Sequence, residues 1–411
     1  MKELFGNAIV GQSGGPTAAI NATLAGVIKG VFAAEEAGKI GKLYGMRNGM
    51  EGLLREDLLD LDEAFADRAR LDTLIHTPSS ALGSCRKKLP DPQKDIATYE
   101  EILRIFRKYD IRYFFYIGGN DSMDAVDKLE AFFRDHDYDV RIIGVPKTID
   151  NDLVMTDHTP GFGSAAKYIA TTIQEILRDC AVYTVRAVTI VEIMGRDAGW
   201  LTTAAALPGA ITGIGPDYLY LPERDFDMAS FLSDVRAAFE KHPNIVIAVS
   251  EGIRFANGHY VGEGAQSGAT DAFAHAYLAG TGKVLEAAVK EEFGCKVRTV
   301  ELNLPQRCAA HLASSTDLAE SVSVGQHAVE AAVSGVSGAM ATILRGEGEY
   351  HTTYGTSPVC EIANRVKHVP DAYINAAGNG VTDACIAYLR PLIAGEVSPE
   401  YKDGLPVHCI L

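Results

Sequence analysis

The chain lacks the features that would place it in a membrane, on nucleic acid or in a disulfide-stapled fold. It has no apolar run of membrane-spanning length, and its first residues lack the apolar core of a signal peptide. Its seven cysteines are scattered, with no C-x-x-C pair and no spacing typical of a metal site. A formal net charge of −16 is unsuited to a nucleic-acid surface. These absences predict a soluble cytoplasmic protein with no membrane and no nucleic-acid partner.

What the sequence does contain is typical of a large α/β protein. Its 411 residues allow two to three domains of about 150 residues each. Short apolar runs alternate with helical patterns, and this rhythm predicts mostly parallel sheets covered by helices. The predicted strands cover residues 8–10, 113–117, 142–145, 187–194 and 245–249, and the predicted helices residues 18–33, 123–133 and 200–207. No low-complexity linker marks a domain boundary.

Two polar segments follow predicted strands directly. Residues 118–122 read Gly-Gly-Asn-Asp-Ser, and residues 146–152 read Pro-Lys-Thr-Ile-Asp-Asn-Asp. In an open parallel sheet, ligands bind beyond the carboxyl ends of the strands. Glycines allow a ligand to approach the backbone closely, and the lysine and acids supply charge. The sequence therefore predicts a phosphate-binding site here, although an Asx-rich loop capped by its own side chains is the structural alternative for residues 146–152.

Two further segments have the character of anion sites. Residues 11–17, Gly-Gln-Ser-Gly-Gly-Pro-Thr, follow the first predicted strand and open a helix, whose N-terminal N–H groups favour an anion. Residues 82–88 end in Arg86, Lys87 and Lys88, a cationic cluster after small residues. A tight strand-to-helix turn and a solvated basic loop are the respective alternatives.

Together with three later segments, these motifs resemble the phosphofructokinase family from about residue 8 to residue 320. The later segments are Met194-Gly195-Arg196, Ser250-Glu251-Gly252 and residues 302–307, Leu-Asn-Leu-Pro-Gln-Arg. ATP-using relatives usually carry glycine where Asp121 and Lys147 stand. The chain thus resembles the pyrophosphate-using branch.

The resemblance implies a role for each residue around the phosphate donor. Asp150 would be the general base, with Lys147 and Arg196 stabilising the transferring group as further catalytic residues. Mg²⁺ is the implied cofactor, and its ligands would be Asn120, in place of the family's usual aspartate, and Asp121. The implied pyrophosphate-binding residues are Gly14, Arg86, Asp121 and Lys147.

A second implied set binds the sugar phosphate. Arg307 matches the residue that grips the 6-phosphate, and Arg298 an arginine that reaches this phosphate from a neighbouring subunit. Leu304 stands where histidine or tyrosine is usual, so one phosphate contact is missing or comes from elsewhere. The full set is Thr148, Asp152, Met194, Gly195, Arg196, Glu251, Arg298 and Arg307.

The resemblance also implies the architecture and the reaction. We expect two Rossmann-like three-layer domains with mostly parallel sheets and the active site in the cleft between them. Residues 1–160 with about 305–345 would bind the donor, and residues 161–304 with about 346–411 would bind fructose 6-phosphate. The expected reaction is reversible transfer of phosphate from pyrophosphate to the sugar 1-hydroxyl by a homodimer or homotetramer.

Three alternatives differ in the residues that they require. An ATP-dependent 6-phosphofructokinase would carry glycine at positions 121 and 147. A non-catalytic sugar-phosphate-binding subunit would not need the intact Asp150, Asp152 and Arg196. A nicotinamide-binding protein would show G-x-G-x-x-G after the first strand, which residues 11–15 do not match. Sequence leaves open whether sedoheptulose 7-phosphate is also an acceptor, and the region from residue 346 carries no motif that we can interpret.

Overall fold

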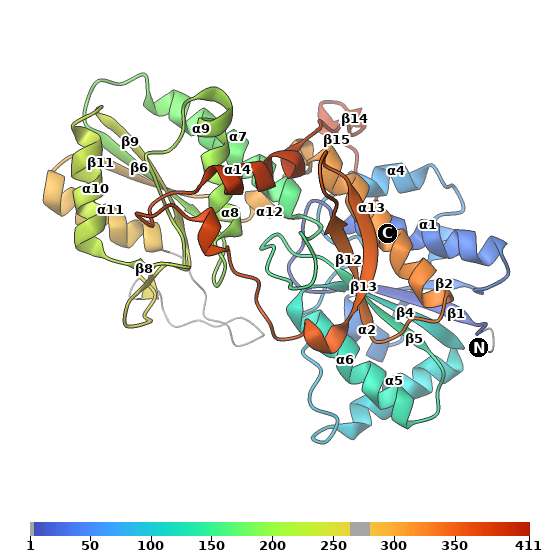
Figure 1. Ribbon diagram of the computed structural model, residues 1–411. Helices are drawn as coiled ribbons and strands as arrows, with labels where there is room; N and C mark the ends of the chain where they lie inside the picture. Colours follow the sequence, from blue (N-terminus) through green and yellow to red (C-terminus); the bar gives the residue numbers. More distant parts are fainter. Residues whose placement is uncertain (1–3, 264–279) are drawn as a thin grey trace.

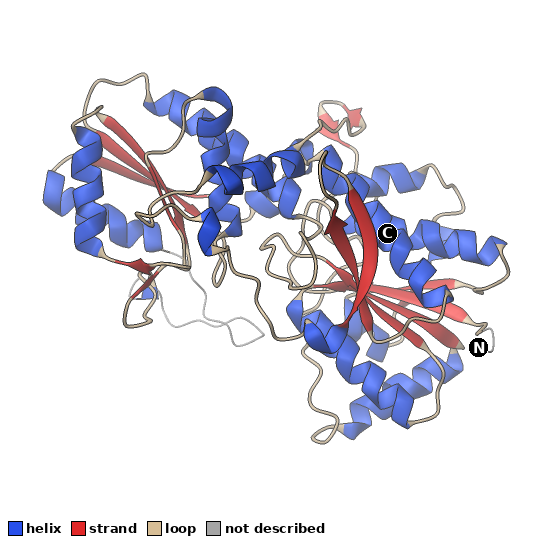
Figure 2. Ribbon diagram, in the orientation of Figure 1, coloured by secondary structure: helices blue, strands red, loops and turns tan. Residues whose placement is uncertain are grey.

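The computed structural model describes residues 4–263 and 280–411, which form two α/β lobes. In each lobe a sheet lies between helices, and the chain crosses between the lobes more than once (Figures 1 and 2). The predicted fold class is confirmed. No helix in the described ranges combines the length and apolar character needed to cross a bilayer.

The larger sheet has seven strands in the order β13-β12-β5-β4-β1-β2-β3. Its pairing is parallel except at the two edges, where β3 and β13 run antiparallel to their neighbours. The register pairs Gly118 with Pro146, so the two polar segments begin side by side. The strands are β1 (Asn7–Gln12), β2 (Leu43–Met46), β3 (Leu58–Asp60), β4 (Ile111–Gly118), β5 (Arg141–Pro146), β12 (Ala339–Arg345) and β13 (Thr352–Pro358).

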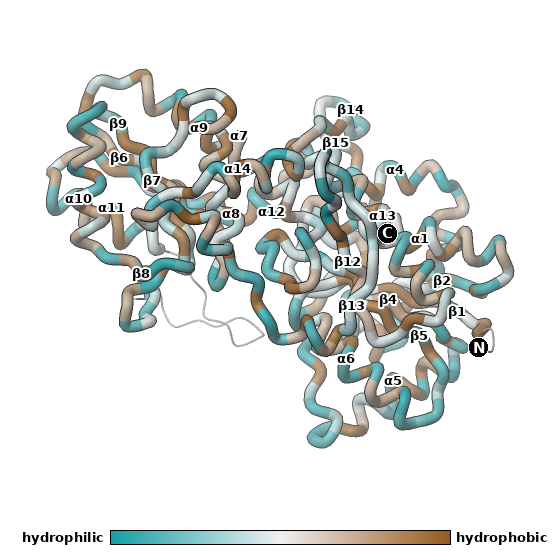
Figure 3. Tube along the Cα trace, viewed as in Figure 1, coloured by the Kyte–Doolittle hydropathy of each residue, from teal (hydrophilic) through white to brown (hydrophobic). Residues whose placement is uncertain are grey.

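Strand alternation builds two hydrophobic cores in this lobe, one on each face of the sheet. Along β4, Phe115 points into the core shared with α1 (Ile20–Glu36) and α13 (Ser315–Val333). Phe114 points into the opposite core, shared with α5 (Ile96–Lys108) and α6 (Asn120–Asp135). This period of two is the one expected for a strand buried on both faces, and Figure 3 shows the hydrophobic residues concentrated along β4 and β5. The shorter helices are α2 (Gly49–Leu54), α3 (Leu61–Ala64) and α4 (Arg70–Ile75).

Helices α1 and α13 approach each other closely because glycine faces the partner backbone on each of them. A Cβ atom on Gly26 would lie 2.1 Å from the Val322 carbonyl oxygen, and one on Gly325 would lie 2.4 Å from that of Thr23. This contact fixes the segment after residue 314 on the larger lobe.

The second sheet has four parallel strands in the order β11-β6-β9-β7. One face packs on α7 (Phe162–Cys180) and the other on α10 (Met228–Phe239) and α11 (Thr281–Phe293). The strands are β6 (Ala187–Ile193), β7 (Tyr218–Tyr220), β9 (Asn244–Ser250) and β11 (Lys296–Glu301). Further elements are α8 (Trp200–Thr203), α9 (Leu207–Thr212), α12 (Pro305–Cys308), α14 (Asp383–Leu389) and the paired short strands β8 (Asp225–Phe226) with β10 (Arg254–Phe255) and β14 (Tyr401–Lys402) with β15 (Leu405–Pro406).

The C-terminal region contributes to both lobes. Strand β13 pairs with β12 at the edge of the larger sheet, and Cys409 packs in a core of that lobe. Between them, Tyr388 and Leu389 of α14 pack in the core of the second lobe. We predicted that the whole tail from residue 346 belongs to the sugar-binding unit, whereas β13 joins the larger sheet. The domain boundaries stay a prediction.

Candidate active site

A cavity of about 490 Å³ collects most of the predicted site residues from both lobes. From the larger lobe come the ends of β1, β4 and β5, and from the second lobe the ends of β6 and β9. All these positions follow carboxyl ends of parallel strands, where ligands are expected. The predicted residues that line it are Gly14, Arg86, Asn120, Asp121, Lys147, Thr148, Asp150, Asp152, Met194, Arg196, Glu251 and Arg307.

The segment after β5 holds Asp150 through local hydrogen bonds. The Thr148 hydroxyl accepts a hydrogen bond from the Asp150 backbone N–H at 3.1 Å and donates one to the Asp150 carboxylate at 3.4 Å. The Thr148 carbonyl in turn accepts from the Thr159 hydroxyl at 2.7 Å. Asn151 adopts a left-handed conformation with φ of 53°, which lets the chain turn back between the two acids.

Asp150 and Asp152 both titrate above the ordinary range of a carboxyl group. Burial raises the pKa of Asp152 to about 7, and the nearby charge of Asp150 adds to this effect. Burial also raises the pKa of Asp150, while the positive charges of Lys147 and Arg196 oppose the shift. A carboxylate with a raised pKa is a stronger base, so Asp150 is suited to take a proton from a hydroxyl.

Lys147 lies buried beneath the glycine turn that follows β1. Its ammonium donates to the Gly15 carbonyl at 2.7 Å, and a Cβ atom on Gly14 would lie 3.2 Å from Nζ. Burial lowers the pKa of Lys147 to about 8, although Asp150 and Asp152 hold it up. A phosphate oxygen at the turn would meet a cation with little competing solvent.

Asn120 and Asp121 begin helix α6 at the cavity wall. The Asn120 amide nitrogen donates to the Arg365 carbonyl at 2.6 Å, while its side-chain oxygen is buried with no hydrogen-bond partner among the described residues. The Asp121 carboxylate lies 3.2 Å from the Lys88 ammonium. This part of the wall offers oxygen ligands beside cations, in the first turn of a helix.

The second lobe supplies a wall with a carboxyl group and backbone groups in fixed positions. The Glu251 carboxyl accepts from the Gly195 N–H at 3.3 Å, and the Gln306 side-chain oxygen accepts from the Met194 N–H at 3.2 Å. Burial raises the pKa of Glu251 to about 8. Gly195 has a φ of 134°, which side-chain-bearing residues rarely adopt. Gly195 does not line the cavity itself, but it orients Glu251, which does.

Arg298 is the one predicted residue that lies away from the cavity and its hydrogen-bonded supports. It sits on β11, an edge strand, about half exposed and 4.0 Å from the carboxylate of Asp179. Our prediction gave it a role from a neighbouring subunit, which a single chain does not test.

The cavity also contains residues that sequence reasoning missed. Lys88 belongs to the cationic cluster but was given no role, and Asp197 directly follows Arg196. Asn364 and Val366 come from the C-terminal region. For these two no sequence signal was available, because ordinary polar and apolar residues in a turn-rich segment carry no motif.

The fold and the cavity define an α/β phosphoryl-transfer protein with its site between two lobes. The family model described as Phosphofructokinase matches residues 7–332, and the chain belongs to this family. It is 43% identical over 409 residues to the pyrophosphate–fructose 6-phosphate 1-phosphotransferase of Halomonas elongata, covering 97% of this chain and 94% of that protein. The crystal structure of the pyrophosphate-dependent phosphofructokinase from Nitrosospira multiformis superposes with a TM-score of 0.88 at 40% identity, covering 98% of this chain and 95% of that one. A sulfofructose kinase of Alkalicoccus urumqiensis is 32% identical, covering 89% of this chain and 91% of that protein.

Proposed function

We propose that this protein transfers a phosphoryl group from pyrophosphate to the 1-hydroxyl of fructose 6-phosphate, reversibly, giving fructose 1,6-bisphosphate and orthophosphate. The observation that carries the proposal is the buried Lys147 between the glycine turn and the Asp150–Asp152 pair. The names of the relatives from Halomonas elongata and Nitrosospira multiformis support the same donor.

The donor side is suited to a compact, highly charged anion. Lys147 adds a cation directly under Gly14 and Gly15, and Arg86 adds another at the cavity wall. Asp121 places a carboxylate, paired with Lys88, where the resemblance puts the nucleoside of ATP. Pyrophosphate fits this arrangement, and a nucleotide would meet an added charge.

The reaction needs a base for the hydroxyl and neutralisation of the transferring charge. Asp150 takes the proton of the sugar 1-hydroxyl, whose oxygen then attacks the nearer phosphorus of pyrophosphate, and orthophosphate leaves. Arg196 and Lys147, whose positive charges both act on Asp150, stabilise the charge on the transferring group. Thr148, Asp152, Met194, Gly195, Glu251 and Arg307 bind or orient the sugar phosphate.

The side-chain oxygens at the cavity wall fit Mg²⁺, which takes oxygen ligands and commonly keeps phosphates and waters among them. Asn120 and Asp121 would hold the ion, and the Asn120 side-chain oxygen has no other partner among the described residues. The described ranges contain no group of three or more His, Cys, Asp or Glu side chains suited to a metal, so pyrophosphate would supply much of the coordination. The ion would neutralise negative charge on the phosphates.

Asp121→Asn is expected to raise the magnesium concentration needed for half-maximal activity, and an unchanged titration would remove Asp121 from this role.

We further propose a homo-oligomer, a dimer or a tetramer, in the cytoplasm. Arg298 is exposed on an edge strand near the exposed apolar side chains of Tyr183 and Val185. Such a patch is typical of a protein–protein contact. A second subunit there would bring Arg298 to the sugar phosphate of its neighbour.

A donor panel tests the proposed function. The purified protein is assayed with fructose 6-phosphate and Mg²⁺ and, separately, pyrophosphate, ATP, ADP or polyphosphate. We expect turnover with pyrophosphate only. Faster turnover with ATP at saturation would instead assign an ATP-dependent kinase, and no turnover with any donor would favour a binding subunit. Sedoheptulose 7-phosphate in place of fructose 6-phosphate measures the acceptor range.

A further inference from the structure

A short C-terminal segment, residues 364–368, crosses the cavity wall and contacts three catalytic segments. We call it the cleft strap. Its Arg365 carbonyl accepts from Asn120 at the start of α6, and its His368 ring lies 2.9 Å from the Asp197 carbonyl oxygen, next to Arg196. Between these contacts, Lys367 reaches the segment that holds Asp150. The strap lies beyond residue 332, where the family match ends.

Lys367 bonds the chain at Asp152 and on both sides of it. Its backbone N–H donates to the Asp152 carbonyl at 2.8 Å. Its ammonium donates to the Asn151 side-chain oxygen at 3.2 Å and to the carbonyls of Thr156 at 3.2 Å and Asp157 at 2.8 Å. One half-buried cation therefore ties the turn between Asp150 and Asp152 to the loop that follows it.

The opposite side of Lys367 is attached to the second lobe. The Trp200 indole N–H donates to the Lys367 carbonyl at 2.8 Å, and the Lys367 ammonium lies 5.3 Å from the centre of the Trp200 ring. Asn151 itself donates to the Tyr388 hydroxyl at 2.9 Å, and Tyr388 also packs on Trp200. The left-handed turn at Asn151 is thus held by two side chains from the C-terminal region.

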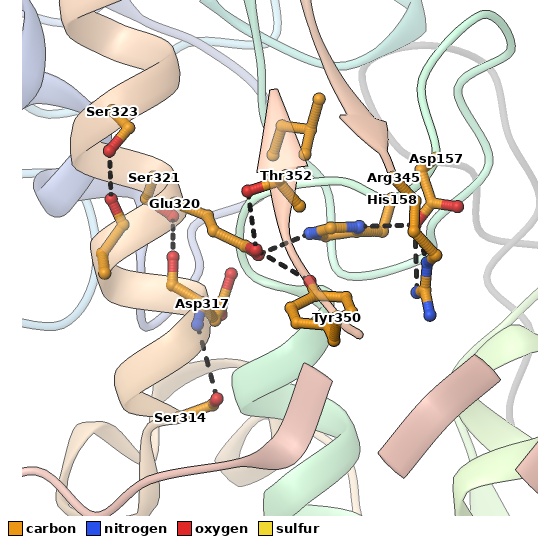
Figure 4. Close-up of polar contacts among 12 residues, drawn as sticks. Asp157, His158, Ser314, Asp317, Glu320, Ser321, Ser323, Arg345, Tyr350 and Thr352 are labelled. Atoms are coloured by element: carbon orange, nitrogen blue, oxygen red, sulfur yellow. Dashed lines mark hydrogen bonds and ion pairs between the residues drawn. The ribbon is translucent and has the colours of Figure 1, made fainter. Parts of the chain in front are cut away.

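Asp157, at one end of this attachment, takes part in a network of further polar contacts (Figure 4). The Asp157 carboxylate bonds His158 at 2.8 Å and Arg345 at 3.0 Å, and the other ring nitrogen of His158 bonds Glu320 at 2.7 Å. Burial disfavours a charged imidazole, but these two carboxylates raise the pKa of His158 overall. Lys367 therefore connects the catalytic turn to a buried, fully bonded network rather than to a free loop.

From this geometry we infer that Lys367 is a positioning residue for phosphoryl transfer, holding Asp150 in place through Asn151 and Asp152. The inference rests on the proposed function. Lys367 is not among the residues that line the cavity, so we expect it to act on the catalytic turn rather than on a substrate. Misplacing a catalytic group by about 1 Å can cost about 100-fold in rate without weakening binding. Loss of Lys367 should therefore act on kcat and leave both KM values in place.

The test is Lys367→Met, which keeps the length of the side chain and removes the ammonium. We expect kcat to fall about 10-fold or more, with the KM values for pyrophosphate and fructose 6-phosphate within about 2-fold of wild type. Lys167→Met is the matched control, because the Lys167 ammonium also donates to two backbone carbonyls, those of Ala313 and Gly395, away from the cavity. The control should keep the wild-type kcat.

The outcomes separate this inference from the proposed function. An inactive wild type would refute the function, whereas an active wild type with an equally active Lys367→Met would refute the inference alone. A variant that changes KM and not kcat would also refute it. If Lys367→Met does not fold, Tyr388→Phe decides, because it keeps the ring against Trp200 and removes the hydroxyl that holds Asn151. A lower kcat at unchanged KM supports the inference, and a wild-type kcat overturns it.

Discussion

The two walls of the cavity bury ionisable groups of opposite type, a lysine on one and a glutamate on the other. On the wall of the larger sheet, burial lowers the pKa of Lys147 to about 8. On the wall of the smaller sheet, burial raises the pKa of Glu251 to about 8. Burial removes water from around each group, so a ligand that bonds to the group would stabilise it. We propose that this ligand is an anion on the first wall and a set of sugar hydroxyls on the second. We therefore infer that the two walls select different substrates, although both are built on strand ends.

Asp150 lies between these two regions and depends on both. The positive charges of Lys147, from the first wall, and Arg196, from the second, each lower its pKa against the effect of burial. The pKa of Asp150, the proposed base, therefore responds to a positive charge from each lobe. Substitutions at Asp150, at each wall and at the proposed subunit contact should therefore have different effects.

The largest effect is expected at the base shared by the two walls. Asp150→Asn keeps the shape of the side chain and removes the proton acceptor, so kcat should fall by ~10²-fold or more. Binding of fructose 6-phosphate, measured by calorimetry, should stay close to wild type. A variant with near-normal kcat would remove Asp150 from the role of base.

The next largest effect is expected at the wall of the larger sheet that holds Lys147, which we call the donor wall. Lys147→Met should raise the KM for pyrophosphate about 10- to 100-fold, as for losing a hydrogen bond to a charged group. The KM for fructose 6-phosphate should change much less. Because Lys147 loses its proton above about pH 8, the wild-type KM for pyrophosphate should rise beyond that pH, and the variant should lack this rise. Equal effects on both KM values would erase the distinction between the walls.

Replacing Glu251 by Gln tests the wall of the smaller sheet, which we call the sugar wall. We expect the KM for fructose 6-phosphate to rise about 10-fold, with little change for pyrophosphate. In the ligand-free protein, Glu251 binds its proton more tightly when folded than when unfolded, so wild-type stability falls as pH rises from about 4.5 to about 8. Glu251→Gln removes this contribution, and its Tm should gain on wild type between pH 5 and pH 8.5. Parallel Tm curves would contradict the assignment of a buried, proton-retaining Glu251.

The smallest effect is expected at the proposed subunit contact. Arg298→Ala should raise the KM for fructose 6-phosphate several-fold and leave that for pyrophosphate unchanged, since Arg298 would complete only the sugar wall. Sedimentation velocity reports the assembly state in parallel. An active monomer would contradict the shared site, and the same KM in the variant would remove Arg298 from it.

The sequence predicted which segments meet on the wall of the larger sheet, because the signals for this are local. The parallel register pairs Gly118 with Pro146, so the two motifs that follow these strands lie side by side. The alternation of strands and helices in the sequence was enough to predict this meeting. The Lys147–Gly15 contact follows from the same rule, since both residues follow strands of one sheet. The fold class was accessible for the same reason.

The sequence did not reveal the cleft strap or the path of the tail. Asn364 and Lys367 have no spacing that marks them, and their positions depend on how the chain leaves β13 and reaches α14. The tail alternates between lobes, which no composition shift records. The pairing of Asp121 with Lys88 was equally hidden, because it joins the first turn of α6 to a loop that meets it only in the folded protein.

The central claim is that the two walls join one donor to one hydroxyl, and ³¹P NMR of the purified wild type tests it most directly. With fructose 6-phosphate, pyrophosphate and Mg²⁺, we predict loss of the pyrophosphate signal, growth of orthophosphate and a new phosphomonoester on carbon 1 of the sugar. Fructose 1,6-bisphosphate with orthophosphate should regenerate pyrophosphate. Growth of orthophosphate without a new sugar phosphate, or no change in any signal, would contradict the account.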